Sequence, residues 1–292
     1  MFEFWIILTA CLVAVNCALL GSFLLLKKMS MVGDALSHSV LPGIVIAFLI
    51  TDTHYSFWSI SIASGIGLLA VFAMNILSEK GGFQRDTAIG ITYTLLFSMG
   101  IIMISAWAKN ADIDVDCVLF GDIGNVPFKE PLILFEVPFP PDTLFLLGFT
   151  LINLFVLFVG LRGFTLTTFD PLFASTLGIS VAVWHYGLLG LTAINTVFSF
   201  DSVGAIMVIS LLVIPAAFAH LFTKRFKPFL ITAVVFGVTN CIAGFYISIL
   251  LNVNIVATIN TLMGTLILFG LLRNVIKTKR KQQSLKPSID HA

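Results

Sequence analysis

Long uninterrupted apolar runs dominate this chain and limit what it can fold into. A helix needs about 20 apolar residues to cross the hydrocarbon core of a bilayer. Runs of that length, or slightly shorter, lie at 4–26, 35–51, 56–78, 88–108, 142–162, 183–200, 202–223, 229–250 and 253–273. They predict an all-α polytopic membrane protein with eight or nine transmembrane helices in a domain at 1–276, followed by a short basic tail at 277–292.

The composition agrees with this class. Charged residues make up 11% of the 292 residues, against about 25% in soluble domains, so a soluble fold could not cover its surface with them. The net charge of +1 gives no support for nucleic-acid binding. The four cysteines form no CxxC pair, which argues against a structural zinc site or a disulfide framework. The first run begins with Glu3 rather than a basic cluster, and we expect a span there rather than a signal peptide.

The distribution of basic residues predicts an orientation. With nine spans, alternate loops hold 14 of the 16 basic residues, and the opposite set holds only Lys109 and Lys129. Loops rich in lysine and arginine lie in the cytoplasm. The amino terminus is therefore expected outside the cell and the carboxyl terminus in the cytoplasm.

The long connection at 109–142 is expected on the outer side and carries seven acidic residues. It is either a solvated loop, or a docking rim or funnel that raises the local concentration of cations. Its middle part, 115–123, is apolar enough to dip into the membrane as a short helix.

The second run contains an aspartate and a histidine, which are costly inside a membrane and usually face a bundle interior or a cavity. Asp34 and His38 are four residues apart, so they share one face of a helix. If the helix enters at Lys28, His38 lies roughly 15 Å deep, about the middle of the hydrocarbon core. Pro42 cannot donate to the carbonyl of residue 38, which leaves that carbonyl free.

A carboxylate, an imidazole and a free carbonyl suit Mn²⁺, Zn²⁺ or Fe²⁺ better than Cu(I), which prefers sulfur ligands. The alternative is a structural pair that pins two helices together. The spacing alone leaves both interpretations open.

The sequence around Asp34, together with several further blocks, resembles that of the permease subunits of bacterial ATP-driven zinc, manganese and iron importers. The resemblance rests on LLKKMSMVGDALSHSVLPGI around Asp34, and on RDTAIGITYTLLFSMG at 85–100, FDPLFASTLGI at 169–179 and SVGAIMVISLLVIPAAFAHLFTKR at 202–225, with a weaker block, VDCVLFGDI, at 115–123. It departs from the family at 250–260, where LLNVNIVATIN replaces a stretch rich in proline and glycine.

The resemblance implies a bacterial cell (inner) membrane location and a transported divalent metal at Asp34 and His38, with no cofactor. It also implies a cytoplasmic ATP-binding subunit, an extracytoplasmic metal-binding protein and a second permease copy or paralogue as partners, besides membrane lipid.

The block at 169–179 predicts one short capped helix. Asp170 suits the N-cap, Pro171 the first helical position and Gly178 the carboxyl cap. A helix of two turns is not stable alone in water, so its apolar side chains must pack on a partner surface. The candidate anchoring side chains are Leu172, Phe173 and Leu177. The partner is a groove on the ATPase, the membrane interface or the chain's own loops. In the family this position corresponds to the coupling helix. Pro42 in the second span is a candidate gating or kink position, and Pro215 is expected to kink the seventh span, either for gating or for packing.

Missing motifs narrow the function further. No GxxxxGK[ST] loop is present, so the chain is not expected to hydrolyse ATP itself, and neither HExxH nor GxSxG occurs. One rival is a secondary cation transporter, which would need more intramembrane carboxylates than Asp34. Another is a membrane-bound metalloenzyme, which would need a third close ligand. The sequence does not distinguish zinc, manganese and iron.

Overall fold

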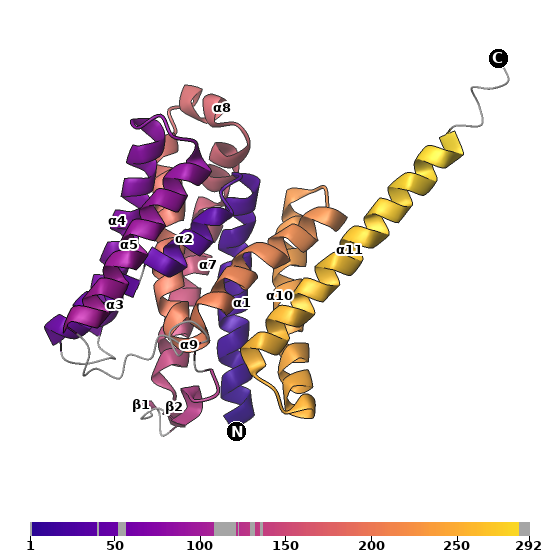
Figure 1. Ribbon diagram of the computed structural model, residues 1–292. Coiled ribbons are helices and arrows are strands. Elements are labelled where there is room, and N and C mark those ends of the chain that lie inside the picture. Colours follow the sequence, from indigo (N-terminus) through magenta and orange to yellow (C-terminus); the bar gives the residue numbers. More distant parts are fainter. Residues whose placement is uncertain are drawn as a thin grey trace, which may run out of the picture.

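A computed structural model describes residues 2–39, 41–51, 57–107, 121, 123–128, 132–134 and 137–285. The elements are, in order, α1 (Phe2–Leu26), α2 (Met31–Ser39), α3 (Leu41–Thr51), α4 (Phe57–Glu79), α5 (Arg85–Trp107), η1 (Val126–Phe128), β1 (Leu132–Leu134), β2 (Val137–Phe139), α7 (Pro141–Phe169), α8 (Pro171–Thr176), α9 (Val181–Phe222), α10 (Phe226–Leu251) and α11 (Ile255–Leu285). Most of the long helices stand side by side in one bundle, with α8 at the end opposite the amino terminus, whereas α11 runs obliquely and extends away from the others (Figure 1).

The predicted all-α membrane fold is confirmed. Within the described ranges, nine helical segments are long and apolar enough to cross a membrane. The helices α2 and α3 together form the second span, Met31–Ile50, whereas α9 contains the sixth and seventh, Val181–Phe200 and Ser202–Phe222. Among the described residues, the sheet content is one short hairpin, in which β1 and β2 pair antiparallel with Leu132 opposite Phe139.

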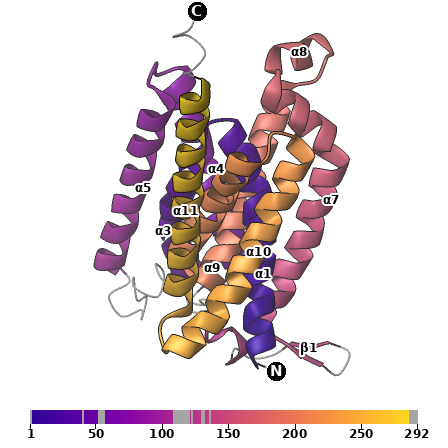
Figure 2. The same ribbon diagram turned by 90° about the vertical axis from the view of Figure 1, so that its right-hand side faces the viewer.

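The first helix is the interior element of the bundle. It packs against α7, α9 and α10 (Figure 2). Its buried face is made largely of small side chains such as Ala14 and Cys17, both fully buried. Gly21 lies so close to α9 that a Cβ atom there would collide with the carbonyl oxygen of Leu212. Close approach through small residues is a main source of helix association in lipid.

Buried polar side chains set the register of α1 against α7. The hydroxyls of Thr9 and Thr143 lie 2.7 Å apart. One heptad further along each helix, the Asn16 side-chain amide donates to Thr150 Oγ1 at 2.8 Å, and Asn153 donates back to Asn16 Oδ1 at 3.0 Å. The seven-residue spacing on both helices is that of parallel coiled-coil packing. Each bond contributes about 0.6 kcal/mol in a membrane.

The chain reverses its direction within α9 at a glycine. Gly204 has φ 76° and ψ 164°, a backbone region open essentially only to glycine. Gly121, with φ 67°, presses on this turn, because a Cβ atom on Gly121 would overlap the backbone of Val203 and Gly204. The segment that carries Gly121 is anchored nearby by buried Ile123 and Val126. Gly121 and the turn in α9 are thus packed directly against each other.

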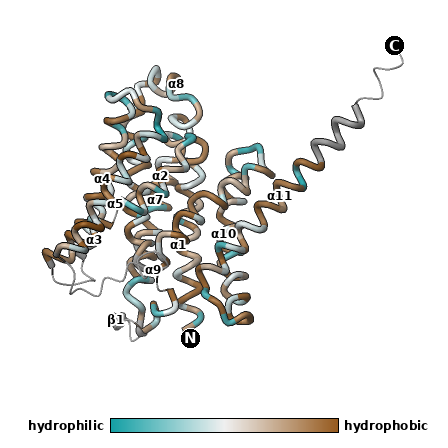
Figure 3. Tube along the Cα trace, in the orientation of Figure 1, coloured by the Kyte–Doolittle hydropathy of each residue, from teal (hydrophilic) through white to brown (hydrophobic). Residues whose placement is uncertain are grey.

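The two ends of the bundle differ. The α4–α5 turn, the α9–α10 turn and the carboxyl end of α11 lie at the α8 end, whereas the β1–β2 hairpin lies at the end with the amino terminus (Figure 1). Hydrophobic residues line most of the helices, and hydrophilic residues gather near the ends (Figure 3). The helix α11 continues past 276 to Leu285. Residues 286–292 of the predicted tail, and all of 115–123 except 121 and 123, lie outside the described residues.

Candidate metal site and coupling helix

The short helix α2 has two faces with different surroundings. Val32 and Leu36 are 2% and 0% exposed and join the main hydrophobic core. Asp34 and His38 are only partly buried. The helix is therefore held by its apolar face, while its ionisable pair stays accessible within the second span.

The predicted pair lies together. His38 Nε2 is 3.5 Å from Asp34 Oδ1, with the two side chains 27% and 39% exposed. This is a weak contact for a hydrogen bond, so neither side chain is committed to the other. Among the residues that the structure describes, no group of three or more His, Cys, Asp or Glu side chains is positioned to hold a metal. One copy of the chain therefore offers two ligating side chains here.

Aromatic side chains of α5 border the histidine. The ring centroid of Tyr93 lies 5.9 Å from that of His38, and the ring of Phe97 stands edge-on to His38 at 5.2 Å. These two aromatics are one turn apart on α5 and restrict the orientation of the imidazole. We did not predict them, although their i, i+4 spacing in the fourth run was a usable signal.

Pro42 lies where the second span divides. It is the second residue of α3, and α2 ends at Ser39. Gly100 of α5 packs against this point, because a Cβ atom there would lie 3.1 Å from the Pro42 nitrogen. A gating role for Pro42 stays a prediction.

Pro215 sits inside α9, whose one residue with non-helical backbone angles is Gly204. Pro215 is buried, and an added Cβ atom on Gly237 of α10 would touch its ring at 3.6 Å. Its gating role likewise stays a prediction. The apolar runs predicted separate spans at 183–200 and 202–223 but did not indicate the glycine turn between them.

The predicted capped helix is present as α8. The carboxylate of Asp170 accepts a hydrogen bond from the Phe173 backbone N–H at 2.9 Å, and Pro171 is the first helical residue. Leu177 is the carboxyl cap, and Gly178 follows it with φ 76°. The side chain of Asp170 and the fixed φ of Pro171 thus start the helix, and the left-handed glycine ends it.

The apolar anchors of α8 point away from this chain. Leu172, Phe173 and Leu177 are 79%, 51% and 57% exposed, and Ala174 is the buried residue of the helix. Their position at one tip of the bundle leaves a free apolar surface (Figure 1). Such a short helix needs a partner for these side chains.

A chain of aromatic contacts forms the base beneath α8. Phe169, the last residue of α7, meets Phe226 of α10 at 5.6 Å, and Phe226 meets Phe23 of α1 at 5.5 Å. Phe23 then contacts Phe164 of α7 at 5.7 Å, and Phe164 contacts Trp184 of α9 at 4.8 Å. Four long helices are thus joined directly under α8. Sequence reasoning missed this set, because its members are far apart in the chain.

Basic side chains lie near this end as well. Burial, and then the nearby Arg85 guanidinium, lower the pKa of the Lys27 ammonium. Lys27 and Arg85, which belong to the first and second loops of the lysine- and arginine-rich set, are therefore neighbours in space, which agrees with their assignment to one side of the membrane.

The comparisons with known proteins bear on this geometry. Residues 1–274 match the family described as the ABC 3 transport family. The chain belongs to the ABC 3 transport family. This family comprises components of transporters, so the chain is a membrane component of a transporter rather than a catalyst.

Several relatives of this ABC 3 chain carry functional descriptions. It is 39% identical over 264 residues to the manganese transport system membrane protein MntD of Bacillus subtilis (strain 168), covering 90% of this chain and 89% of that protein. It is 32% identical over 290 residues to the zinc transport system membrane protein TroD of Treponema pallidum (strain Nichols), covering 98% and 78%. It is 33% identical over 245 residues to the chelated iron transport system membrane protein YfeD of Yersinia pestis, covering 83% and 75%.

The fold of the ABC 3 chain also matches a solved structure. A chain of PsaBC from Streptococcus pneumoniae in complex with Fab superimposes with a TM-score of 0.78 at 28% identity, covering 92% of this chain and 91% of that one. The arrangement of spans around α1 is therefore that of a chain of PsaBC.

Proposed function

We propose that this chain is the permease subunit of an ATP-driven importer that moves a divalent transition metal, Mn²⁺, Zn²⁺ or Fe²⁺, into the cytoplasm. The observation that carries the proposal is the partly exposed Asp34–His38 pair within a transmembrane span. Ionisable groups inside a membrane usually mark an ion pathway. The descriptions of manganese, zinc and chelated iron transport systems among the relatives support this class of cargo.

The second part of the proposal concerns the energy source. We assign ATP hydrolysis to a separate cytoplasmic subunit that docks on the exposed apolar side chains of α8. The supporting observations are the free surface of Leu172, Phe173 and Leu177 and the aromatic base that ties α8 to four long helices. This assignment places α8 in the cytoplasm, in agreement with the basic residues at that end.

The third part concerns the ligand number. Two copies of the chain, or this chain and a paralogue, would bring two carboxylates and two imidazoles together across a shared axis. Four such ligands are the usual number for a closed zinc-like site. The two carboxylates would also balance the charge of the divalent ion. An extracytoplasmic metal-binding protein would deliver the ion to the opposite end of the bundle.

The test is uptake by the complete transporter reconstituted in proteoliposomes. We expect uptake of Mn²⁺ or Zn²⁺ to need ATP on the α8 side, and His38→Ala and Asp34→Asn each to abolish it. His220→Ala is the matched control, because this histidine is exposed near the end of α9. Metal binding should also weaken at acid pH, because protons compete for the imidazole.

Two outcomes would overturn the proposal. Uptake driven by an ion gradient without ATP would indicate the secondary transporter. Normal uptake by both variants at wild-type expression would make Asp34 and His38 a structural brace and place the metal elsewhere.

A further inference from the structure

The glycine that precedes Asp34 receives a side chain from another helix. A Cβ atom built on Gly33 would lie 2.8 Å from Cδ1 of Leu212, and 3.6 Å from its Cβ. The end of the Leu212 side chain therefore occupies the space that Gly33 leaves open on α2. The residue next to Gly33 in sequence is Asp34, and His38 follows one turn later.

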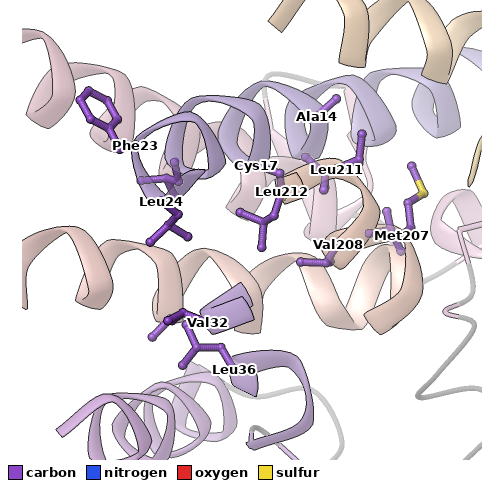
Figure 4. Close-up of a cluster of buried hydrophobic side chains, with 14 of the residues drawn as sticks. Ala14, Cys17, Phe23, Leu24, Val32, Leu36, Met207, Val208, Leu211 and Leu212 are labelled. Carbon is purple, nitrogen blue, oxygen red and sulfur yellow. The ribbon is translucent and has the colours of Figure 1, made fainter. Parts of the chain in front are cut away.

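Leu212 is closely packed on both its backbone and its side chain. It is 2% exposed, and its backbone lies against Gly21 of α1, where an added Cβ atom would strike its carbonyl oxygen. Figure 4 shows Leu212 within a buried cluster to which α1, α2 and α9 all contribute side chains. An extra methyl group in an interior of this density forces side chains off their preferred rotamers or shifts the backbone.

We propose that Leu212 is a positioning residue for metal binding: its side chain, seated on Gly33, fixes the place of α2 and so the place of the Asp34–His38 pair. The inference rests on the proposed function, since it assigns a supporting residue to the proposed metal site. Leu212 does not contact the metal, and it acts through the backbone of α2.

The distances give the size of the effect. An ordinary contact begins near 3.4 Å, and the added atom would lie at 2.8 Å, so the Leu212 side chain and α2 must together give way by about 0.6 Å to accept a methyl group at Gly33. Because Leu212 is packed on all sides in the core, we infer that α2 takes up much of this displacement. Binding sites tolerate displacements of about 0.5 Å before their geometry is lost. A shift of α2 moves both ligands relative to Tyr93 and Phe97 on α5, which border His38.

The experiment measures Mn²⁺ binding and thermal unfolding on the complete transporter in lipid nanodiscs. We expect Gly33→Ala to weaken Mn²⁺ binding about tenfold or more. The double variant Gly33→Ala with Leu212→Ala removes the clash and should recover binding to within about threefold of wild type. The matched control is Gly244→Ala, where the added atom would lie 2.6 Å from Ile259 at the α10–α11 contact. Gly244→Ala should lower the unfolding temperature without weakening Mn²⁺ binding.

A second pair of variants covers the case in which Gly33→Ala does not fold. Leu212→Val removes the atom that touches Gly33, whereas Leu211→Val removes one from a neighbour that is equally buried on the same helix. We expect only Leu212→Val to weaken Mn²⁺ binding, at similar losses of thermal stability.

The inference fails if Gly33→Ala binds Mn²⁺ like wild type. It also fails if Gly33→Ala and Gly244→Ala weaken Mn²⁺ binding alike, or if Leu212→Val and Leu211→Val do. His38→Ala separates this failure from failure of the proposed function. If His38→Ala removes Mn²⁺ binding but the Leu212 and Gly33 variants do not affect it, the metal site stands and the positioning role is wrong. If His38→Ala leaves binding intact, the proposed site itself is wrong.

Discussion

The indole of Trp184 packs onto the bare backbone of Gly163. A Cβ atom on Gly163 would overlap the indole ring, and one on Gly160, a turn earlier, would lie 2.7 Å from Cζ3 of Trp184. These contacts join α7 to α9, the two helices that flank α8.

We predict that Gly163→Ala lowers the free energy of unfolding by about 1–3 kcal/mol, because the methyl group overpacks the indole contact. Gly148→Ala on the same helix is the control, since an added Cβ atom there meets nothing within 4 Å. That control should be neutral or stabilising by up to about 1 kcal/mol. Thermal unfolding in detergent measures both, and equal behaviour of the two variants would contradict the proposed contact.

The turn in α9 gives a second prediction. Gly204→Ala forces a Cβ atom into a backbone conformation that costs about 1–3 kcal/mol for other residues. The same change at Gly187, in the helical part of α9 with open space around it, should cause no loss. Thermal unfolding of the two variants, side by side, is the measurement. A Gly204→Ala protein as stable as wild type would show that the turn does not need glycine.

Much of this architecture was predictable from local patterns. The spans follow from apolar runs of sufficient length, and the cap of α8 follows from Asp170, Pro171 and Gly178 at their preferred positions. The accessible Asp34–His38 pair follows from helical periodicity. Each of these signals lies within a few residues of the feature that it predicts.

The features that escaped prediction depend on distant parts of the chain. Sequence patterns did not indicate the turn at Gly204, where the backbone of Gly121 also lies. Likewise, nothing near Gly33 in sequence indicates that Leu212 fills the space beside it. Single-sequence patterns carry periodicity and capping, but not which helices meet.

The cap of α8 leads to a third prediction. Asp170→Ala removes the acceptor for the Phe173 N–H and should destabilise α8 locally by about 1 kcal/mol. We expect metal-stimulated ATP hydrolysis by the complete transporter to fall several-fold, with normal membrane insertion. Asp170→Ser retains a capping oxygen and should keep most of the activity. Unchanged stimulation in Asp170→Ala would argue against a role of the cap in coupling.

The orientation is tested by labelling single cysteines in a chain whose four native cysteines are replaced by alanine. Phe128→Cys and Leu172→Cys probe the two ends of the bundle, because these side chains are 71% and 79% exposed. In intact cells, an impermeant thiol reagent should label position 128 and not position 172. The opposite pattern would reverse the predicted topology.

The bonds between α1 and α7 have a consequence for how the protein is made. Asn16 is fully buried, and its partners Thr150 and Asn153 follow 134 and 137 residues later. At roughly 5–20 residues per second, they leave the ribosome about 7–27 s after Asn16. Until then the amide of Asn16 must find another polar partner, because lipid supplies none. The buried polar contacts of α1, the first helix to be synthesised, therefore form late. When α7 arrives, Thr150 and Asn153 replace the polar group that binds the Asn16 amide during insertion.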